Sequence, residues 1–142
     1  MAALTLKTAQ QITEAALAKA GELGLKPLVV VVLDARGCLK AALAQDGTSL
    51  LRGQIAHGKA YGALALGMGS RAIFQRAQEQ AFFVDAVNTL AQGALVPVPG
   101  GVLVHNGAGE LLGAVGISGD TSDNDEACAV AGIEAAGLVP KP

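Results

Sequence analysis

The segment from Pro97 to Asp120 limits the fold more than any other part of the chain, because it combines two apolar runs with a tight turn. The runs are Val-Leu-Val-His at 102–105 and Glu-Leu-Leu-Gly-Ala-Val-Gly-Ile-Ser at 110–118, and Asn106-Gly107-Ala108-Gly109 separates them. Two apolar runs joined by a short turn rich in Asn and Gly predict a β-hairpin. The chain must therefore bury at least one antiparallel pair of strands.

A second hairpin of the same design lies earlier in the chain. Leu28 to Leu33 is a valine-rich run that predicts a strand covered on both faces, and Cys38 to Ala44 follows after the turn at 34–37. Residues 32–41 and 104–113 share the order strand, Asp or Asn, two residues, Gly, strand. The repeat indicates that both halves contribute a hairpin to one antiparallel sheet; convergent turn chemistry is the alternative.

Helices are predicted before, between and after the hairpins. Residues 5–23 have the apolar spacing of an amphipathic helix, which Gly24 and Pro27 end. Residues 49–92 are largely helical, with Ser49 as an N-cap and two shorter helices around 71–78 and 81–92. The last helix begins near Ser122, where Thr121 is a capping residue and four acidic residues face the positive end of the helix dipole.

Composition narrows the functional class. The 142 residues predict a single domain, 1–142, in which 51% of residues are apolar and only 3% aromatic. The net charge of −2 lacks the basic footprint of a nucleic-acid binder. We find neither a signal-peptide pattern nor an apolar run of 18 residues, which predicts a cytoplasmic protein with no membrane partner.

The long helix after residue 49 is apolar on two sides, which predicts that it packs between its own sheet and a second subunit. The chain is thus expected to form a homo-oligomer. One predicted stripe contains Leu50, His57, Tyr61, Leu64 and Met68, and the other contains Leu51, Ile55, Gly62 and Leu66.

Few residues of the chain are candidates for catalysis or for ligand binding. His57 lies in the middle of the long helix, where it is a candidate acid/base or haem ligand; a histidine with a satisfied hydrogen bond is the alternative. Lys59 and Arg52 share a face of that helix and could hold an anion; a solvated or salt-bridged face is the alternative. His105 ends a strand at a turn, and its spacing from His57 does not indicate a metal pair.

The order of these motifs resembles that of the GlcG/HbpS-like family, also called the haem-degrading domain family. The resemblance rests on Lys59-Ala60 in the long helix, Pro99-Gly100-Gly101-Val102, and Gly113-Ala-Val-Gly-Ile-Ser-Gly119 followed by Asp125-Glu126. It covers nearly the whole chain. It implies a three-layer α/β (α+β) fold of the PAS/profilin-like group, with about five antiparallel strands flanked by helices, and a homo-oligomer.

The resemblance implies less about chemistry, because one fold hosts many functions. Family members include extracellular haem binders, domains of corrinoid adenosyltransferases and stand-alone proteins encoded beside catabolic enzymes. This chain has no histidine in its first helix and few aromatic residues to stack on a porphyrin. These departures favour the stand-alone, cytoplasmic, catabolic type.

We therefore expect a small-molecule site between the Pro-Gly-Gly loop and the long helix. The ligand would be a small carbonyl or carboxylate compound, and an enzyme of this kind would be a hydrolase, lyase or isomerase that needs no cofactor. A haem or tetrapyrrole binder that uses His57 or His105 is the alternative. The expected catalytic residues are His57 and Lys59, and the expected ligand-binding residues are Arg52, Tyr61, Pro99, Gly100 and Gly101.

Overall fold

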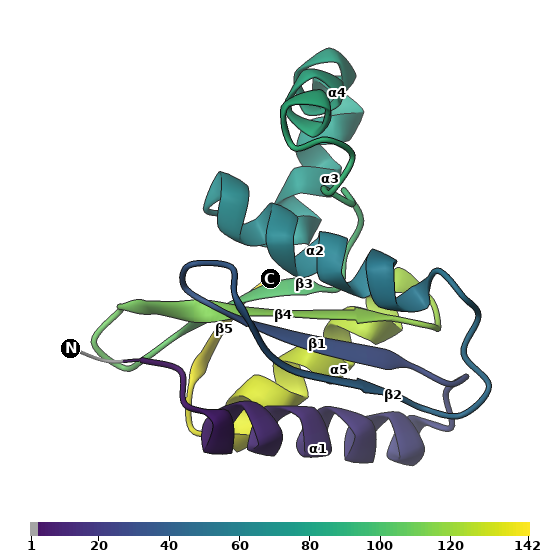
Figure 1. The fold of residues 1–142 in the computed structure, drawn as a ribbon, viewed down its shortest axis with the longest axis vertical. Coiled ribbons are helices and arrows are strands. Elements are labelled where there is room, and N and C mark those ends of the chain that lie inside the picture. The colour runs from purple at the N-terminus through teal and green to yellow at the C-terminus, as the bar shows by residue number, and fades with distance from the viewer. Residues whose placement is uncertain (1–2) are drawn as a thin grey trace.

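An antiparallel sheet of five strands, in the order β2-β1-β4-β3-β5, separates two helical layers in the computed structural model, which describes residues 3–142 (Figure 1). Helices α1 and α5 cover one face, and α2 covers the other. The helices are α1 (Leu6–Leu23), α2 (Arg52–Leu66), α3 (Ser70–Glu79), α4 (Ala81–Leu90) and α5 (Ser122–Ala135). The strands are β1 (Val29–Asp34), β2 (Leu39–Ala44), β3 (Gly101–His105), β4 (Leu111–Ser118) and β5 (Val139–Lys141). The predicted three-layer fold is confirmed.

The turns of the two predicted hairpins have the same pattern of hydrogen bonds. The Asp34 Oδ1 atom accepts from the backbone N–H groups two and four residues later, at 2.9 and 3.0 Å, and Asn106 Oδ1 does the same at 3.0 and 2.9 Å. Gly37 and Gly109 close the turns at φ values of 84° and 83°, a region that glycine enters without strain. Strands β1 and β4 pair antiparallel and so join the two hairpins into one sheet.

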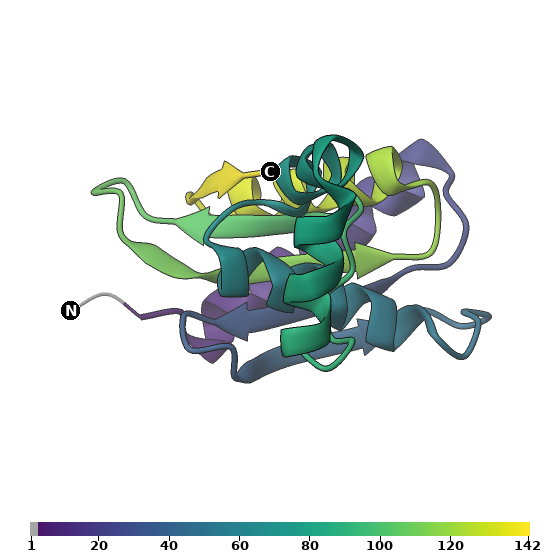
Figure 2. The same ribbon diagram turned by 90° about the horizontal axis from the view of Figure 1, so that it is seen from above.

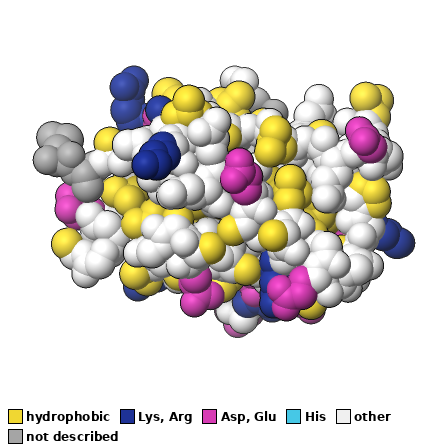
Figure 3. All heavy atoms as spheres, turned by 90° about the horizontal axis from the view of Figure 1, so that it is seen from below, with side chains coloured by type: hydrophobic (Ala, Val, Ile, Leu, Met, Phe, Trp, Pro, Cys, Tyr) yellow, Lys and Arg dark blue, Asp and Glu magenta, His cyan; other side chains and the backbone are white. Residues whose placement is uncertain are grey.

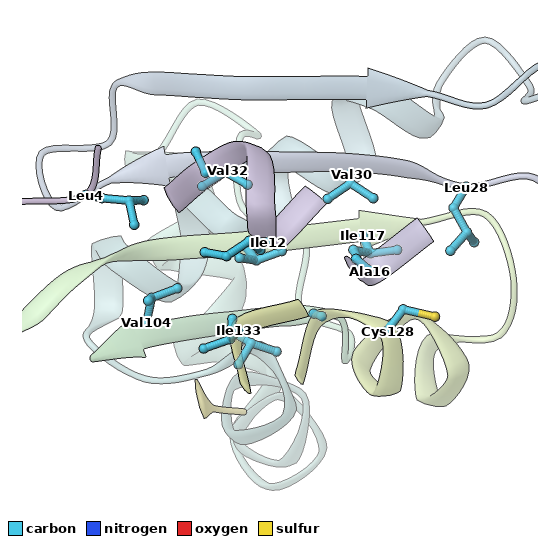
Figure 4. Packing of buried hydrophobic residues seen from close by; sticks show 14 of the residues in the cluster. Leu4, Ile12, Ala16, Leu28, Val30, Val32, Val104, Ile117, Cys128 and Ile133 are labelled. Carbon is cyan, nitrogen blue, oxygen red and sulfur yellow. The ribbon is translucent and has the colours of Figure 1, made fainter. Parts of the chain in front are cut away.

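The larger core lies between the sheet and the α1/α5 layer. Aliphatic side chains fill it, and α1 and α5 also pack against each other (Figure 4). On the surface of this layer, apolar side chains and charges of both signs are interspersed (Figure 3). The side chains labelled in Figure 4 are Ile12 and Ala16 of α1, Cys128 and Ile133 of α5, Val30, Val32, Val104 and Ile117 of the sheet, and Leu4 and Leu28, which precede α1 and β1.

Helix α2 approaches the opposite face of the sheet through small residues. Ala56, Ala60 and Ala63 are fully buried against β1, β3 and β4. A Cβ atom on Gly116 of β4 would lie only 1.9 Å from the Ala56 carbonyl oxygen, so the backbones almost touch. The three alanines therefore form the centre of this contact, and of the two predicted apolar stripes only Tyr61 and Leu64 pack against the same cluster. Leu50, which precedes the helix, is 96% exposed.

Helices α3 and α4 form an arm that rises from α2 (Figures 1 and 2). A small apolar cluster centred on Ile73, Val84 and Leu95 holds the arm to the segment that leads into β3. The outer side of α4 has no such cover, because Phe82 is 76% exposed and Leu90 is 83% exposed. The arm thus presents an apolar surface to solvent.

One local expectation differs from the structure, and one strand has no signal in the sequence. The prediction that Ser49 caps the long helix is wrong: α2 begins at Arg52 after Leu51, and the Ser49 hydroxyl instead accepts a hydrogen bond of 3.2 Å from Arg52 Nε. Strand β5 carries no hairpin signal in the sequence, because it pairs with the distant strand β3. By contrast, Thr121 caps α5 as predicted and accepts from the Asn124 N–H group.

Replacing Gly116 with alanine tests the close approach of α2 to the sheet. We expect Gly116→Ala to lower the free energy of unfolding by about 2 kcal/mol or more, because the new methyl group must push α2 away from β4. Urea denaturation measures this change. Gly107→Ala is the matched control, since a Cβ there meets nothing within 4 Å, and it should change the stability by less than about 0.5 kcal/mol. Equal stability of the two variants would contradict the close contact between α2 and β4.

Candidate functional site

Lys59 lies inside the protein and not on a ligand-facing surface. Its side chain is 2% exposed, and its ammonium donates to the Ile117 carbonyl oxygen at 2.8 Å and to Asp125 Oδ2 at 3.0 Å. Burial lowers the pKa of Lys59, although the Asp125 carboxylate opposes this shift. Asp125 is also buried, and its other oxygen accepts from the Asp120 N–H group. The pair connects α2, β4 and α5.

The Pro-Gly-Gly loop is packed onto this buried lysine. A Cβ atom on Gly100 would lie 2.8 Å from Lys59 Nζ, and one on Gly101 would lie 2.2 Å from the Lys59 carbonyl oxygen. The Gly101 N–H group donates to the Ser70 hydroxyl at 2.6 Å. The glycines are therefore required by the approach of α2, and the space in which we expected a ligand is filled by protein.

Arg52 points in the same direction as Lys59. Its guanidinium donates to the hydroxyl of the buried Ser118, at the end of β4, with a distance of 3.2 Å. The two cations do share a face of α2, as predicted, but that face is turned towards the sheet. Neither Arg52 nor Lys59 lines the cleft beside His57 described next.

A cleft of about 370 Å³ lies beside His57, between the first turns of α2 and the segment that follows α4. The His57 imidazole is half-buried and stacks on Tyr61, with 5.9 Å between the ring centres and 16° between their planes. Tyr61 thereby orients the ring without lining the cleft itself. The lining residues are Gly53, Gln54, His57, Gln92, Gly93, Ala94 and Val96.

The polar groups of this cleft are uncharged amides and one imidazole. Gln54 comes from α2 and Gln92 from the α4–β3 connection, and both side chains are exposed. Gln92 has a φ of 57°, which among residues 3–142 is the one left-handed conformation at a residue other than glycine. Such backbone conformations cost free energy and often occur at binding sites. Neither glutamine belongs to a motif or an apolar stripe, so no sequence pattern singles it out.

A second, smaller cleft of about 270 Å³ lies next to Pro99. Phe74 and Val98 form part of its wall, and Arg71 stands at its edge. The Arg71 guanidinium is already paired with Asp123 and with Glu126, whose Oε2 atom lies 2.9 Å from Arg71 Nε. Pro99 lines this second cleft and not the one that contains His57. No expected catalytic residue reaches this second cleft.

His105 lies apart from both clefts, at the end of β3. Its Nδ1 atom is buried without a hydrogen-bond partner, and burial together with the nearby Lys141 lowers the pKa of the imidazole. In the part of the chain that the structure describes, no group of three or more His, Cys, Asp or Glu side chains is arranged to hold a metal ion. Over the same residues, none of the helices is both long and apolar enough to cross a membrane.

The sequence matches the family model of the HbpS-like haem-degrading proteins over residues 4–134. The chain belongs to this family. No curated protein matches it. The family assignment agrees with the resemblance found in the motifs, and it covers all the elements described above except β5 and the end of α5.

Several solved structures share the fold of this HbpS-like chain. A crystal structure of PduOC in complex with haem is 28% identical in sequence, with a TM-score of 0.87 over 96% of this chain and 97% of that one. Protein ORFY of Klebsiella pneumoniae is 26% identical, with a TM-score of 0.84 over 94% and 90% of the two chains. A double mutant of HbpS from Streptomyces reticuli is 24% identical, with a TM-score of 0.79 over 94% and 87%. The last of these shows the fold alone.

The buried Lys59–Asp125 pair of this HbpS-like protein can be tested by removing one charge or both. We expect Asp125→Leu to destabilise the protein by about 3–5 kcal/mol, because it leaves a buried ammonium without its partner. The double variant Lys59→Met with Asp125→Leu should be more stable than that single variant. Urea denaturation of the three proteins measures both differences.

The exposed pair of Lys19 and Glu22, 3.3 Å apart, supplies the matched control. Glu22→Gln should change the stability by less than about 0.5 kcal/mol, because a solvated i,i+3 pair contributes little. If Asp125→Leu lowers the free energy of unfolding by no more than Glu22→Gln does, the buried pair does not hold the three layers together.

Proposed function

We propose that this HbpS-like protein binds a small molecule in the cleft beside His57, and that His57 acts there as the acid/base of a catabolic reaction on a small carbonyl or carboxylate compound. The observation that carries the proposal is the convergence of His57, Gln54 and Gln92 on one cleft of about 370 Å³. This volume lies within the usual range of ligand pockets, roughly 300–1,000 Å³. A cytoplasmic location remains a prediction.

The proposed role of His57 rests on its position and not on a triad. Its ring is held by Tyr61 and reaches the cleft, where an imidazole can donate a proton to a bound molecule or accept one from it. Lys59 is not part of the proposed chemistry, because its ammonium is buried against Asp125. The ligand is likewise placed at His57 and not at Gly100 or Gly101.

Binding of haem is the second candidate, favoured by the similarity to PduOC in its complex with haem. The cleft fits this group poorly. His57 could supply an axial imidazole, but the cleft has no aromatic side chain to cover a porphyrin face and no lysine or arginine to pair with the propionates. His105 is the other imidazole, and it lines none of the clefts described above. The residues that line this cleft therefore do not suit haem.

The His57 cleft can be tested with small aldehydes, ketones, amides and carboxylates added singly to isotope-labelled protein. We expect the bound compounds to shift the NMR signals of Gly53, His57 and Gly93 together, because these residues line one cleft. His57→Ala should weaken that binding at least fivefold, and any turnover of a bound compound should be lost. His105→Ala is the control and should leave binding unchanged.

Two results would count against the proposal. Shifts confined to Phe74 and Val98 would place the ligand in the other cleft. A hemin titration with a sharp Soret band that disappears in His57→Ala would replace the proposal by the haem-binding alternative, whereas a Soret change insensitive to both histidine variants would remove haem as a specific ligand.

Self-association is the second part of the proposal. Phe82, Ala86 and Leu90 follow one another at i, i+4 and i+8 on the exposed side of α4, opposite the side on which Val84 is buried. Only Asp85 carries a charge among the ten residues of this helix. An apolar stripe on a projecting helix is typical of a contact between subunits, and it supports a homo-oligomer built through the arm.

Placing a charge on this stripe tests the assembly. We expect Phe82→Asp to lower the molar mass measured by light scattering after gel filtration, because a carboxylate would be buried in the contact. Leu6→Asp is the matched control: it also lies in the first turn of a helix and is 53% exposed, but on α1. A wild-type protein that is monomeric, or an unchanged mass in Phe82→Asp, would contradict an assembly through α4.

A further inference from the structure

The cleft beside His57 offers hydrogen bonds but no countercharge. None of its seven lining residues is Asp, Glu, Lys or Arg. The two cations nearest in sequence are directed elsewhere, since Arg52 donates to Ser118 and Lys59 to Asp125. A charged ligand group that leaves water needs an opposite charge to offset its desolvation, and this cleft supplies none from a side chain.

The two glutamines favour a ligand that both donates and accepts hydrogen bonds. Each side-chain amide carries two N–H donors and a carbonyl acceptor. Gln54 and Gln92 come from different elements and line the same cleft, so a molecule between them can meet a donor and an acceptor at once. Ala94 and Val96 supply an apolar wall for the rest of the molecule.

From these features we infer that the ligand of the His57 cleft is a small uncharged carbonyl compound with a carboxamide-like group, and not a carboxylate or a cation. This inference rests on the proposed function, because it names the ligand class of the same cleft. The carbonyl oxygen accepts hydrogen bonds from a glutamine amide or from His57, and the ligand N–H group donates to the other glutamine. The apolar part lies against Val96.

One feature of the cleft would favour an anion instead. Gly53 and Gln54 belong to the first turn of α2, where backbone N–H groups give the helix a partial positive charge. That partial charge is weaker than a lysine or arginine side chain, and a neutral carbonyl oxygen can accept from the same groups. A comparison of ligands that share one shape and differ in charge therefore decides the question.

Benzamide, benzoate and benzamidinium provide this series at neutral pH, since they are nearly isosteric and are neutral, anionic and cationic, respectively. Titrations of the full chain followed by NMR should show benzamide shifting the signals of His57 and Gly93, with an affinity at least tenfold higher than that of either ion. Gln54→Leu should weaken benzamide binding at least fivefold. Gln10→Leu, which changes another exposed glutamine on α1, should leave benzamide binding unchanged.

The possible failures are distinguishable. If benzoate or benzamidinium binds the cleft as tightly as benzamide, the inferred ligand class is wrong while the proposed site at His57 stands. If none of the three shifts the signals of the cleft, the inference is overturned, and the broader set of aldehydes, ketones and carboxylates then decides whether the site itself is wrong. Thermal unfolding of Gln54→Leu confirms that its loss of binding does not reflect loss of the fold.

Discussion

The buried pair of Lys59 and Asp125 is the interaction on which the three layers depend. The lysine extends from α2 to the Ile117 carbonyl of β4 and to the carboxylate at the start of α5, and both side chains are almost completely buried. Charges removed from water must be paired, so this arrangement permits few other positions of α2. The position of α2 also depends on small residues, because only the absence of a side chain at Gly116 and Gly101 lets the α2 backbone approach the sheet so closely.

Because the cations of α2 contact the sheet, they do not contribute charge to the cleft on the other side of the helix. Arg52 and Lys59 are the charged residues on the sheet-facing side of α2, and both are engaged there. The outer side of the helix is left with His57, Gln54 and an uncharged cleft. The same HbpS-like fold is found in a protein crystallised with haem, yet the chemistry of a site follows from its own side chains and not from the fold.

Much of the fold was predictable because its determinants are local. Asp34 and Asn106 organise their turns through hydrogen bonds within four residues, and Thr121 caps α5 through its own first turn. The sequence also predicted that a ligand approaches the glycines of the Pro-Gly-Gly loop. What approaches them, however, is α2, and a sequence pattern cannot distinguish a neighbouring helix from a ligand because both require the same absence of a side chain.

The sequence by itself determined the hairpins, the helices and the family, since periodicity, turn residues and motif order are properties of short segments. Only the tertiary structure decided where the candidate residues lie and what they contact. Lys59 is separated from Asp125 by 66 positions, and Gln92 lies near His57 only because the segment after α4 returns to α2, where the Val96 N–H group donates to the Gly58 carbonyl. Such contacts depend on how distant segments pack, so the lysine that we expected to be catalytic is buried against Asp125, and two glutamines that no pattern singles out line the cleft beside His57.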